Sequence, residues 1–469
     1  MVPRGADRRG VDRRGVDRRG IDRRGVDRRF LLGLAAVTVA ALSWRVVYTL
    51  LAHRGDRNLF DEGDAFFYGP VASNLAKGHW FTNPFTGAPA ADHPPVTVLL
   101  LSLPARLLPD SVLALRLTMS VVGSLAVAAI GWLGRALGGA RLGIAAAIVA
   151  AINPNLWMND AVVMSEAPSA LLIALTLWAG YRLAARPSLA RAAALGALTG
   201  LTVLVRAEMA LLLPFMVLPL ALGARQLRWS ARLGRAALAG AVAVAVVLPW
   251  SLSMAARFRD PVLISTNDGD TLWGANCPVT YDTGLVGGWA LGCVLGQRSG
   301  PAGSPEGRMS AEAATLVRAR GCRAKSLDKS EASTCERRLA VSYARRHLER
   351  LPVVVVARQG RTWGFWRPDQ MAYANQGEGR PNWASWTGFG FLWATTPLAV
   401  AGAVRLRRRG ARLTPLLACL AVVVTIVTLF YGIPRFRLPW DVASTVLVAA
   451  ALVGAAARSP DLNARSDAA

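Results

Sequence analysis

Ten apolar segments, separated by short arginine clusters, constrain this sequence more than any other feature. An α-helix needs about 20 apolar residues to cross a bilayer, and fewer where neighbouring helices shelter it. Hydrophobic residues make up 53% of the chain and charged residues 18%, whereas a soluble domain carries about 25% charged residues. The sequence therefore excludes a soluble multidomain enzyme and predicts an all-α polytopic membrane protein. The predicted transmembrane helices, about ten in number, lie near 30–52, 112–133, 142–157, 165–184, 192–205, 209–222, 236–254, 386–404, 413–431 and 439–457.

The arginine clusters also predict the orientation of the chain. The formal net charge is +25, from 54 Lys+Arg against 29 Asp+Glu. Because the clusters lie between apolar segments, as in cytoplasmic loops, they indicate a membrane protein and no nucleic-acid partner. Loops such as 182–191 and 405–412 contain no acidic residue, whereas Asp61, Asp92 and Glu208 fall on the opposite side. We therefore expect a multi-pass protein of a bacterial plasma membrane, with a cytoplasmic N-terminus and acidic outer loops.

The same reasoning divides the chain into parts. Residues 95–108 are apolar but short and contain Pro104, so we expect a re-entrant or interfacial helix on the outer face. The predicted parts are a disordered cytoplasmic Arg/Asp repeat tail (1–29), an N-terminal membrane module (30–254) with a first outer loop (53–111), an extracytoplasmic domain of mixed structure (255–385), C-terminal membrane helices (386–457) and a cytoplasmic tail (458–469).

The predicted outer domain contains four of the five cysteines. This distribution suits an oxidising compartment and two disulfides. The simplest pairing joins Cys277 to Cys293 and Cys322 to Cys335, although the spacing leaves the other two pairings open. Cys419 lies within a predicted transmembrane helix.

Three carboxylates, Asp61, Glu62 and Asp64, come directly after the first apolar segment. Ionisable groups beside hydrocarbon are costly and usually have a function there, although a solvated loop entrance would look the same. Asp61 and Asp64, together with His79, Asp92 and His93, could hold a divalent metal ion, but their spacing is irregular. The sequence indicates no other cofactor.

The motifs around these acids occur in a characteristic order. They are Asp61-Glu62, Tyr68, His93-Pro94-Pro95, Met164-Ser165-Glu166, GLTVLVRAEMALLLP with Arg206, and YGIPRFRLPWD near the last apolar segment. In this order they resemble the C-type glycosyltransferase superfamily, whose members take sugars from polyprenyl phosphates. Members include the dolichyl-phosphate-mannose protein mannosyltransferases and the lipid A aminoarabinose transferases. The resemblance covers roughly 30–254 and 386–457.

The resemblance implies that a carboxylate of the first outer loop acts as the catalytic base, and the matching residue is Asp61. Glu62 could orient Asp61 or the acceptor. The departing lipid phosphate needs positive charge, for which a bidentate guanidinium is well suited, and Arg206, Arg435 and Arg437 are candidates.

Other candidate donor-binding residues each have a plain structural alternative. Glu166 stands where relatives often carry Asp, and it could bind sugar hydroxyls or cap the helix that begins at Ser165. His93 could equally be a structural loop residue. The remaining candidates are Tyr68, Arg358 and Arg361. The two arginines alternate with aromatic residues in RQGRTWGFWRP, a pattern that an interfacial aromatic belt with snorkelling arginines would also give.

The function implied is an inverting hexosyl- or pentosyltransferase that moves a sugar from a polyprenyl phosphate to a cell-envelope glycan, lipid or exported protein. The alternative is a transporter or flippase of lipid-linked sugars. Transporters place ionisable groups near the middle of broken helices, often in repeated halves. Here the apolar segments are nearly free of charge and no repeat occurs outside 5–29, which favours the enzyme.

Overall fold

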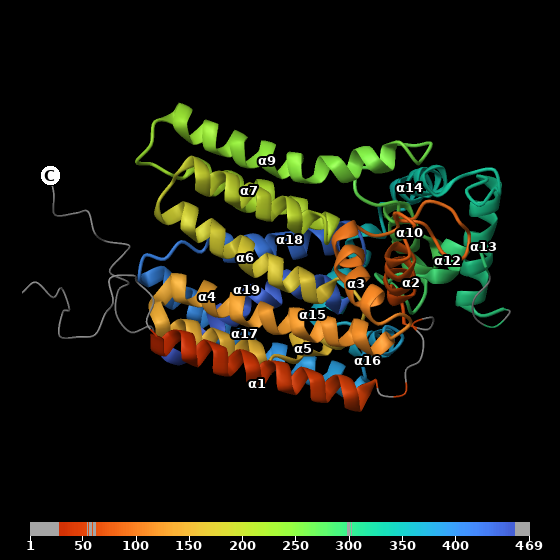
Figure 1. Cartoon of the computed structure of the whole chain (residues 1–469). Coiled ribbons are helices and arrows are strands. Elements are labelled where there is room, and N and C mark those ends of the chain that lie inside the picture. The colour runs from red at the N-terminus through yellow and green to blue at the C-terminus, as the bar shows by residue number, and fades with distance from the viewer. Residues whose placement is uncertain are drawn as a thin grey trace, which may run out of the picture.

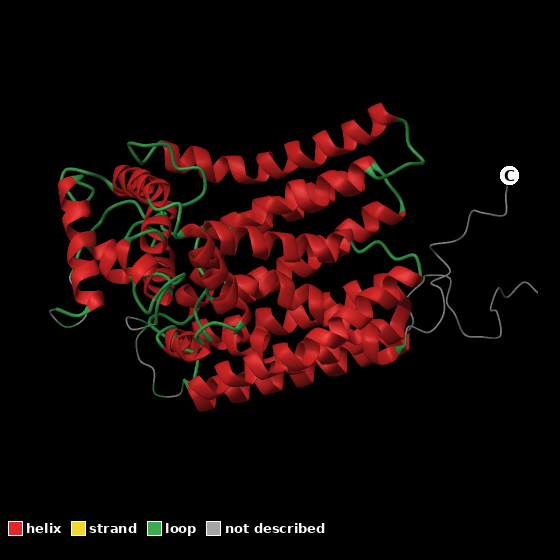
Figure 2. Cartoon of the chain, turned by 180° about the vertical axis from the view of Figure 1, so that it is seen from behind, coloured by secondary structure: helices red, strands yellow, loops and turns green. Residues whose placement is uncertain are grey.

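A computed structural model describes residues 28–53, 55, 59, 62–297, 301 and 303–454. The predicted tail 1–29, except its last two residues, and the tail 458–469 lie outside this part of the chain. Long helices run side by side through the molecule, and shorter helices gather at one end of them (Figure 1). No strand occurs among the described residues (Figure 2), where one isolated bridge joins Thr82 to Pro89.

The long helices coincide with the predicted apolar segments. Six described helices are long and apolar enough to cross a membrane, and four shorter apolar stretches accompany them. The number that actually crosses stays a prediction. The bounds are α1 Arg28–Ala52, α4 Val112–Ile152, α5 Pro154–Trp157, α6 Glu166–Ala185, α7 Leu189–Val203, α8 Leu218–Leu222, α9 Trp229–Ala255, α17 Asn382–Arg408, α18 Thr414–Leu429 and α19 Leu438–Val453.

Helix α4 is a hairpin of two arms, as the separate segments 112–133 and 142–157 predict. The turn falls at Gly138 and Gly139, whose dihedral angles are not helical, and Gly139 has a φ of 80°. Only glycine adopts such a conformation without strain. The arms approach so closely that a Cβ atom at Gly143 would lie 2.7 Å from the carbonyl oxygen of Gly131. Gly138 and Gly139 therefore permit the turn, and Gly143 permits the close packing of the two arms.

The shorter helices cover one end of the bundle (Figure 1). Within 255–385, where mixed structure was predicted, the described residues form helices and loops. Both predicted disulfides, Cys277–Cys293 and Cys322–Cys335, are present and hold this region together. The bounds are α2 Ala65–Ala76, α3 Pro95–Leu107, α10 Asp268–Ala275, α11 Pro278–Asp282, α12 Leu291–Leu295, α13 Pro305–Ala319, α14 Lys329–Arg346, α15 Leu351–Trp363 and α16 Pro368–Gln376.

Helix α3 occupies the segment predicted to be re-entrant or interfacial. It begins at Pro95, where proline fits the first turn because no hydrogen-bonding N–H is needed there. Val98 and Leu101 are buried, whereas Leu99, Leu103 and Leu107 are exposed at four-residue intervals. An exposed apolar stripe of this kind suits a helix lying in the membrane interface.

Candidate active site

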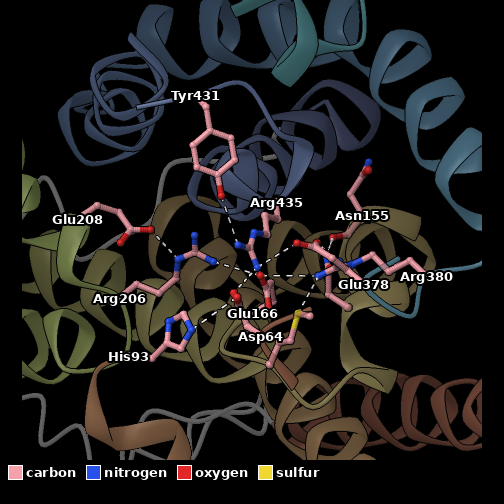
Figure 3. A network of polar contacts seen from close by, with 12 residues as sticks. Asp64, His93, Asn155, Glu166, Arg206, Glu208, Glu378, Arg380, Tyr431 and Arg435 are labelled. Carbon is pink, nitrogen blue, oxygen red and sulfur yellow. Dashed lines mark hydrogen bonds and ion pairs between the residues drawn. The ribbon is translucent and has the colours of Figure 1, made fainter. Parts of the chain in front are cut away.

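A network of ion pairs joins residues that stand just before α2, at the start of α6, just before α17 and just before α19 (Figure 3). Asp64, just before α2, accepts from Arg435 Nη1 at 2.5 Å and lies 3.6 Å from Nε2 of His93. Arg435 lies in the short 3₁₀ helix Pro434–Arg437, directly before α19, and its Nη1 is also 3.3 Å from Glu378. The first outer loop, the region before α17 and the segment before α19 therefore meet at one arginine.

A second arginine pair joins this network to helix α6. Arg206 Nη1 lies 3.2 Å from Glu166, and its Nε donates to Glu208 at 2.6 Å. Arg380 Nη2 lies 3.7 Å from Glu166, and Arg380 Nη1 donates to Glu378 at 2.5 Å. Figure 3 shows these side chains converging from separate parts of the chain. Anions and cations alternate, so each buried charge has an opposite charge beside it.

The charge state of Asp64 follows from its neighbours. Burial raises the pKa of this carboxyl, but the Arg435 guanidinium and His93 outweigh burial and hold the pKa well below its usual range. A carboxylate with so low a pKa is a weak proton acceptor at neutral pH. Asp64 is therefore suited to holding Arg435 in place, and proton abstraction would fall to another group.

Asp61, the predicted base, lies outside the described residues. Its neighbour Glu62 accepts from Arg116 Nη2 at 2.5 Å, and Arg116 also donates to the carbonyl oxygen of Ala161 at 2.8 Å. A Cβ atom at Gly379 would lie 2.9 Å from Oε2 of Glu62. Glu62 thus packs against the loop that carries Glu378 and Arg380.

Tyr68 and His93 lie beside Asp64. Their rings stack with centroids 4.9 Å apart, and Tyr68 is almost wholly buried. Glu166, for which two interpretations were open, begins α6, but the Ser165 side chain makes no capping hydrogen bond there. The Glu166 carboxylate instead lies beside Arg206 and Arg380, which favours a role within the site.

Arg437 follows Arg435 by two positions but points into the protein. It bonds to Asp441 at 3.0 Å and donates to Asn155 at 2.9 Å. The hollow beside it has a volume of about 10 Å³, room for roughly one water molecule. Phe436 separates Arg435 from Arg437 in the sequence, and its ring centroid lies 5.6 Å from the guanidinium carbon of Arg206.

Arg358 and Arg361 lie apart from this network. Both are almost wholly buried. Arg358 donates to the carbonyl oxygens of Thr428 and Ala275, and Arg361 donates to the carbonyl oxygen of Val286. These bonds tie α15 to the last turn of α18, to the end of α10 and to the loop between α11 and α12. A donor-binding role for either arginine stays a prediction.

Several charged or polar side chains of the network were not among the predicted site residues: Asp64, Glu208, Glu378, Arg380 and Tyr431, whose hydroxyl accepts from Arg435 Nη2 at 3.4 Å. Asp64 was visible as one of three adjacent acids, and Glu378 and Arg380 flank Gly379 just before α17. Within the described part of the chain, no group of three or more His, Cys, Asp or Glu side chains could hold a metal ion.

Comparison with known proteins finds a family match over part of the chain. Residues 92–252 match the profile of a family described as dolichyl-phosphate-mannose-protein mannosyltransferase. The resemblance to C-type glycosyltransferases is thereby confirmed. A search of curated protein sequences finds no match.

Solved structures with a similar course of the chain include two membrane glycosyltransferases. The archaeal oligosaccharyltransferase AglB from Archaeoglobus fulgidus, in complex with an inhibitory peptide and a dolichol-phosphate, is 15% identical with a TM-score of 0.49, over 89% of this chain and 50% of that one. ArnT from Cupriavidus metallidurans, bound to undecaprenyl phosphate, is 15% identical with a TM-score of 0.44, over 91% of this chain and 78% of that one. The chain thus spans about half the length of the oligosaccharyltransferase.

Proposed function

We propose that this protein is an inverting glycosyltransferase that moves a sugar from a polyprenyl-phosphate donor to a cell-envelope acceptor. The observation that supports it best is the meeting of Asp64, Glu166, Arg206 and Arg435 in one network. The family match over 92–252 adds independent support for the reaction class. The acceptor is a glycan, a lipid or an exported protein.

Asp61 is the proposed base. Its carboxylate takes the proton of an acceptor hydroxyl as that oxygen attacks the anomeric carbon, and Glu62 orients it. Such general-base catalysis contributes about 10²–10⁴ in rate. The new C–O bond forms as the bond from the anomeric carbon to the phosphate oxygen breaks, and the electron pair leaves with the lipid phosphate. Attack from the opposite face inverts the anomeric configuration.

The leaving phosphate departs as an anion and needs positive charge more than it needs a proton. Arg435 and Arg206 are the proposed phosphate-binding groups. Arg437 is proposed to hold the backbone next to Phe436, whose ring lies beside the Arg206 guanidinium. Each guanidinium offers donors in a geometry that fits a phosphate. The carboxylates Asp64 and Glu166 keep Arg435 and Arg206 in place until the donor arrives.

The proposed topology puts this site on the outer face of the membrane, with the N-terminus in the cytoplasm. The arginine-rich loops 182–191 and 405–412 would face the cytoplasm, as the positive-inside rule requires. The acidic first outer loop and the disulfide-bonded region would face an oxidising compartment, where disulfides persist.

The alternative of a transporter for lipid-linked sugars is less well supported. The charged residues of the network stand at helix ends, such as Asp64 before α2, Glu166 at the start of α6 and Arg435 just before α19. A transporter would place them midway along broken helices. A glycosyltransferase should also work in detergent without a gradient, whereas transport needs two compartments.

The test uses purified protein in detergent, a panel of polyprenyl-phosphate sugars and an envelope-lipid extract. Release of free polyprenyl phosphate is followed for wild type, Asp61→Asn and the matched control Asp369→Asn, an exposed acid on the outer helices. We expect release with one donor, lost in Asp61→Asn and kept in the control. Unchanged release by Asp61→Asn would overturn the assignment of the base. No release from any donor by folded protein would overturn the enzyme in favour of the transporter.

A further inference from the structure

Helix α14 carries an exposed basic face that the ion-pair network does not use. The face forms a shallow hollow of about 420 Å³. Its lining residues come from one helix, and we call them the α14 arginine face: Arg337, Arg338, Val341, Ser342, Arg345 and Arg346.

Helix geometry spaces these charges regularly. Positions 337 and 345 are eight residues apart, as are 338 and 346, which corresponds to about 12 Å along the helix axis. The α14 arginine face therefore presents two pairs of guanidinium groups, one at each end of the hollow, with Val341 between them.

Several of these guanidinium groups are available for a ligand. Arg337 pairs with Asp268, and Arg346 Nε donates to the Ser342 carbonyl oxygen of its own helix. Within the described residues, the guanidinium groups of Arg338 and Arg345 have no hydrogen-bond or ion-pair partner. Guanidinium groups recognise carboxylates and phosphates by paired hydrogen bonds.

The helix that presents the face is firmly anchored. Leu339, Ala340 and Tyr343 are buried on its other side, and Cys335 joins it to Cys322. Asp328 accepts hydrogen bonds from the first turn and caps the helix. An anchored face loses little conformational freedom on binding, which favours affinity.

Neither the positive-inside rule nor contact with a membrane surface explains why α14 carries these exposed arginines. The positive-inside rule explains arginines in cytoplasmic loops, whereas α14 belongs to the proposed outer region. A helix that lies on a membrane needs an exposed apolar face, but the larger apolar side chains of α14 are buried and Val341 is 40% exposed. A soluble ligand with repeated negative charges fits better.

We propose that the α14 arginine face binds a linear polymer of the cell envelope that carries carboxylate or phosphate groups. The proposed function, on which this step rests, makes that polymer the acceptor of the transferred sugar. Its anionic groups would sit on the two arginine pairs while a neighbouring hydroxyl reaches the site.

The first experiment measures binding to the full-length protein in detergent without any donor. The probes are fluorescent polygalacturonate for carboxylates, inorganic polyphosphate for phosphates and neutral dextran. The test variant is Arg338→Ala/Arg345→Ala/Arg346→Ala. The matched control is Arg318→Ala/Arg320→Ala/Lys325→Ala, which removes three exposed positive charges from the same region.

We expect one anionic probe to bind, with affinity that falls as salt rises and drops about tenfold in the α14 variant, and about twofold or less in the control. The anionic probe that binds more tightly identifies the charged group. Equal loss in both triple variants, equal binding of dextran, or binding to phosphatidylglycerol vesicles that depends on α14 while neither polymer binds would overturn the proposal.

A second measurement separates this proposal from the proposed function. Donor hydrolysis to free polyprenyl phosphate depends on the ion-pair network and should be unchanged in the α14 variant. Loss of polymer binding with donor release intact confirms the binding face. Polymer binding without release from any donor would leave the face valid and overturn the enzyme and the acceptor role together.

Discussion

Arg435 Nη1 lies 2.5 Å from Oδ2 of Asp64, although the two residues are 371 positions apart in the chain. The pair joins the loop after the first long helix to the segment directly before the last one. Because Arg435 also contacts Glu378, one guanidinium holds together three segments that are far apart in the sequence. The site therefore depends on the packing of segments that are far apart in the sequence.

Replacing Arg435 by methionine should damage both stability and activity. A buried ion pair that loses one partner costs about 3–5 kcal/mol, and we expect about 2 kcal/mol because the Asp64 side chain is 28% exposed. Donor turnover should fall about 10²-fold or more, since one phosphate-binding group is lost. The measurements are thermal unfolding in detergent and release of polyprenyl phosphate.

The controls for this variant separate folding from chemistry. Arg367→Met breaks the exposed pair with Asp369 and should change both quantities little. Asp64→Asn/Arg435→Met leaves no unpaired carboxylate at position 64 and should regain part of the stability without the activity. Recovery of activity in the double variant would contradict a role for Arg435 in phosphate binding.

Much of the fold was predictable from the sequence because the membrane imposes a length on each apolar segment. The helices coincide with the predicted segments, including the two arms of α4, whose turn at Gly138 and Gly139 separates them. The disulfides were also predictable as local pairs, since their cysteines are 16 and 13 residues apart.

The short helices of the outer region, and the network residues Glu378 and Arg380, could not be predicted from the sequence. Helices of five to eight residues such as α10, α11 and α12 are too short to show a clear period. Glu378 and Arg380 reach the site only through tertiary packing of the outer region against α6. Arg358, for which donor binding stays a prediction, donates to carbonyl oxygens in the structure. A sequence does not distinguish a ligand-binding arginine from one that binds the backbone.

The stability of the outer region should fall as pH rises, because of Glu336. Burial raises the pKa of this carboxyl to about 9, helped by a hydrogen bond to Asp270 and by its charge, while Arg323 and Lys329 act in the opposite direction. A raised folded-state pKa means that the stabilising contribution is complete below about pH 4.5 and is lost as pH approaches about 9.

Glu336→Gln keeps a neutral side chain at every pH, so its unfolding temperature should decline less between about pH 5 and about pH 9. The matched control is Glu349→Gln, an exposed acid next to the same helix, which should follow the wild type. Parallel curves for wild type and Glu336→Gln would show that this carboxyl is not protonated in the folded protein.

Removal of the second disulfide should destabilise the outer region measurably. The bond between Cys322 and Cys335 closes a loop of 13 residues, for which the loss is about 3 kcal/mol. We expect Cys322→Ser/Cys335→Ser to unfold at lower temperature and to respond less to reductant than the wild type does. Cys419→Ala removes the free buried cysteine and should leave the response to reductant unchanged, whereas an altered response would point to a different pairing.

The α4 hairpin predicts a steric effect at Gly143. A Cβ atom there would lie 2.7 Å from the Gly131 carbonyl oxygen and 2.8 Å from the Phe30 ring, so Gly143→Ala must push the two arms apart. Overpacking of this kind costs about 1–3 kcal/mol. Gly240→Ala is the matched control, because a Cβ atom there meets nothing within 4 Å and alanine favours a helix by about 1 kcal/mol. Thermal unfolding in detergent should rank Gly240→Ala at or above wild type and Gly143→Ala clearly below it, and equal unfolding temperatures for the two variants would mean that the arms of α4 are not packed this closely.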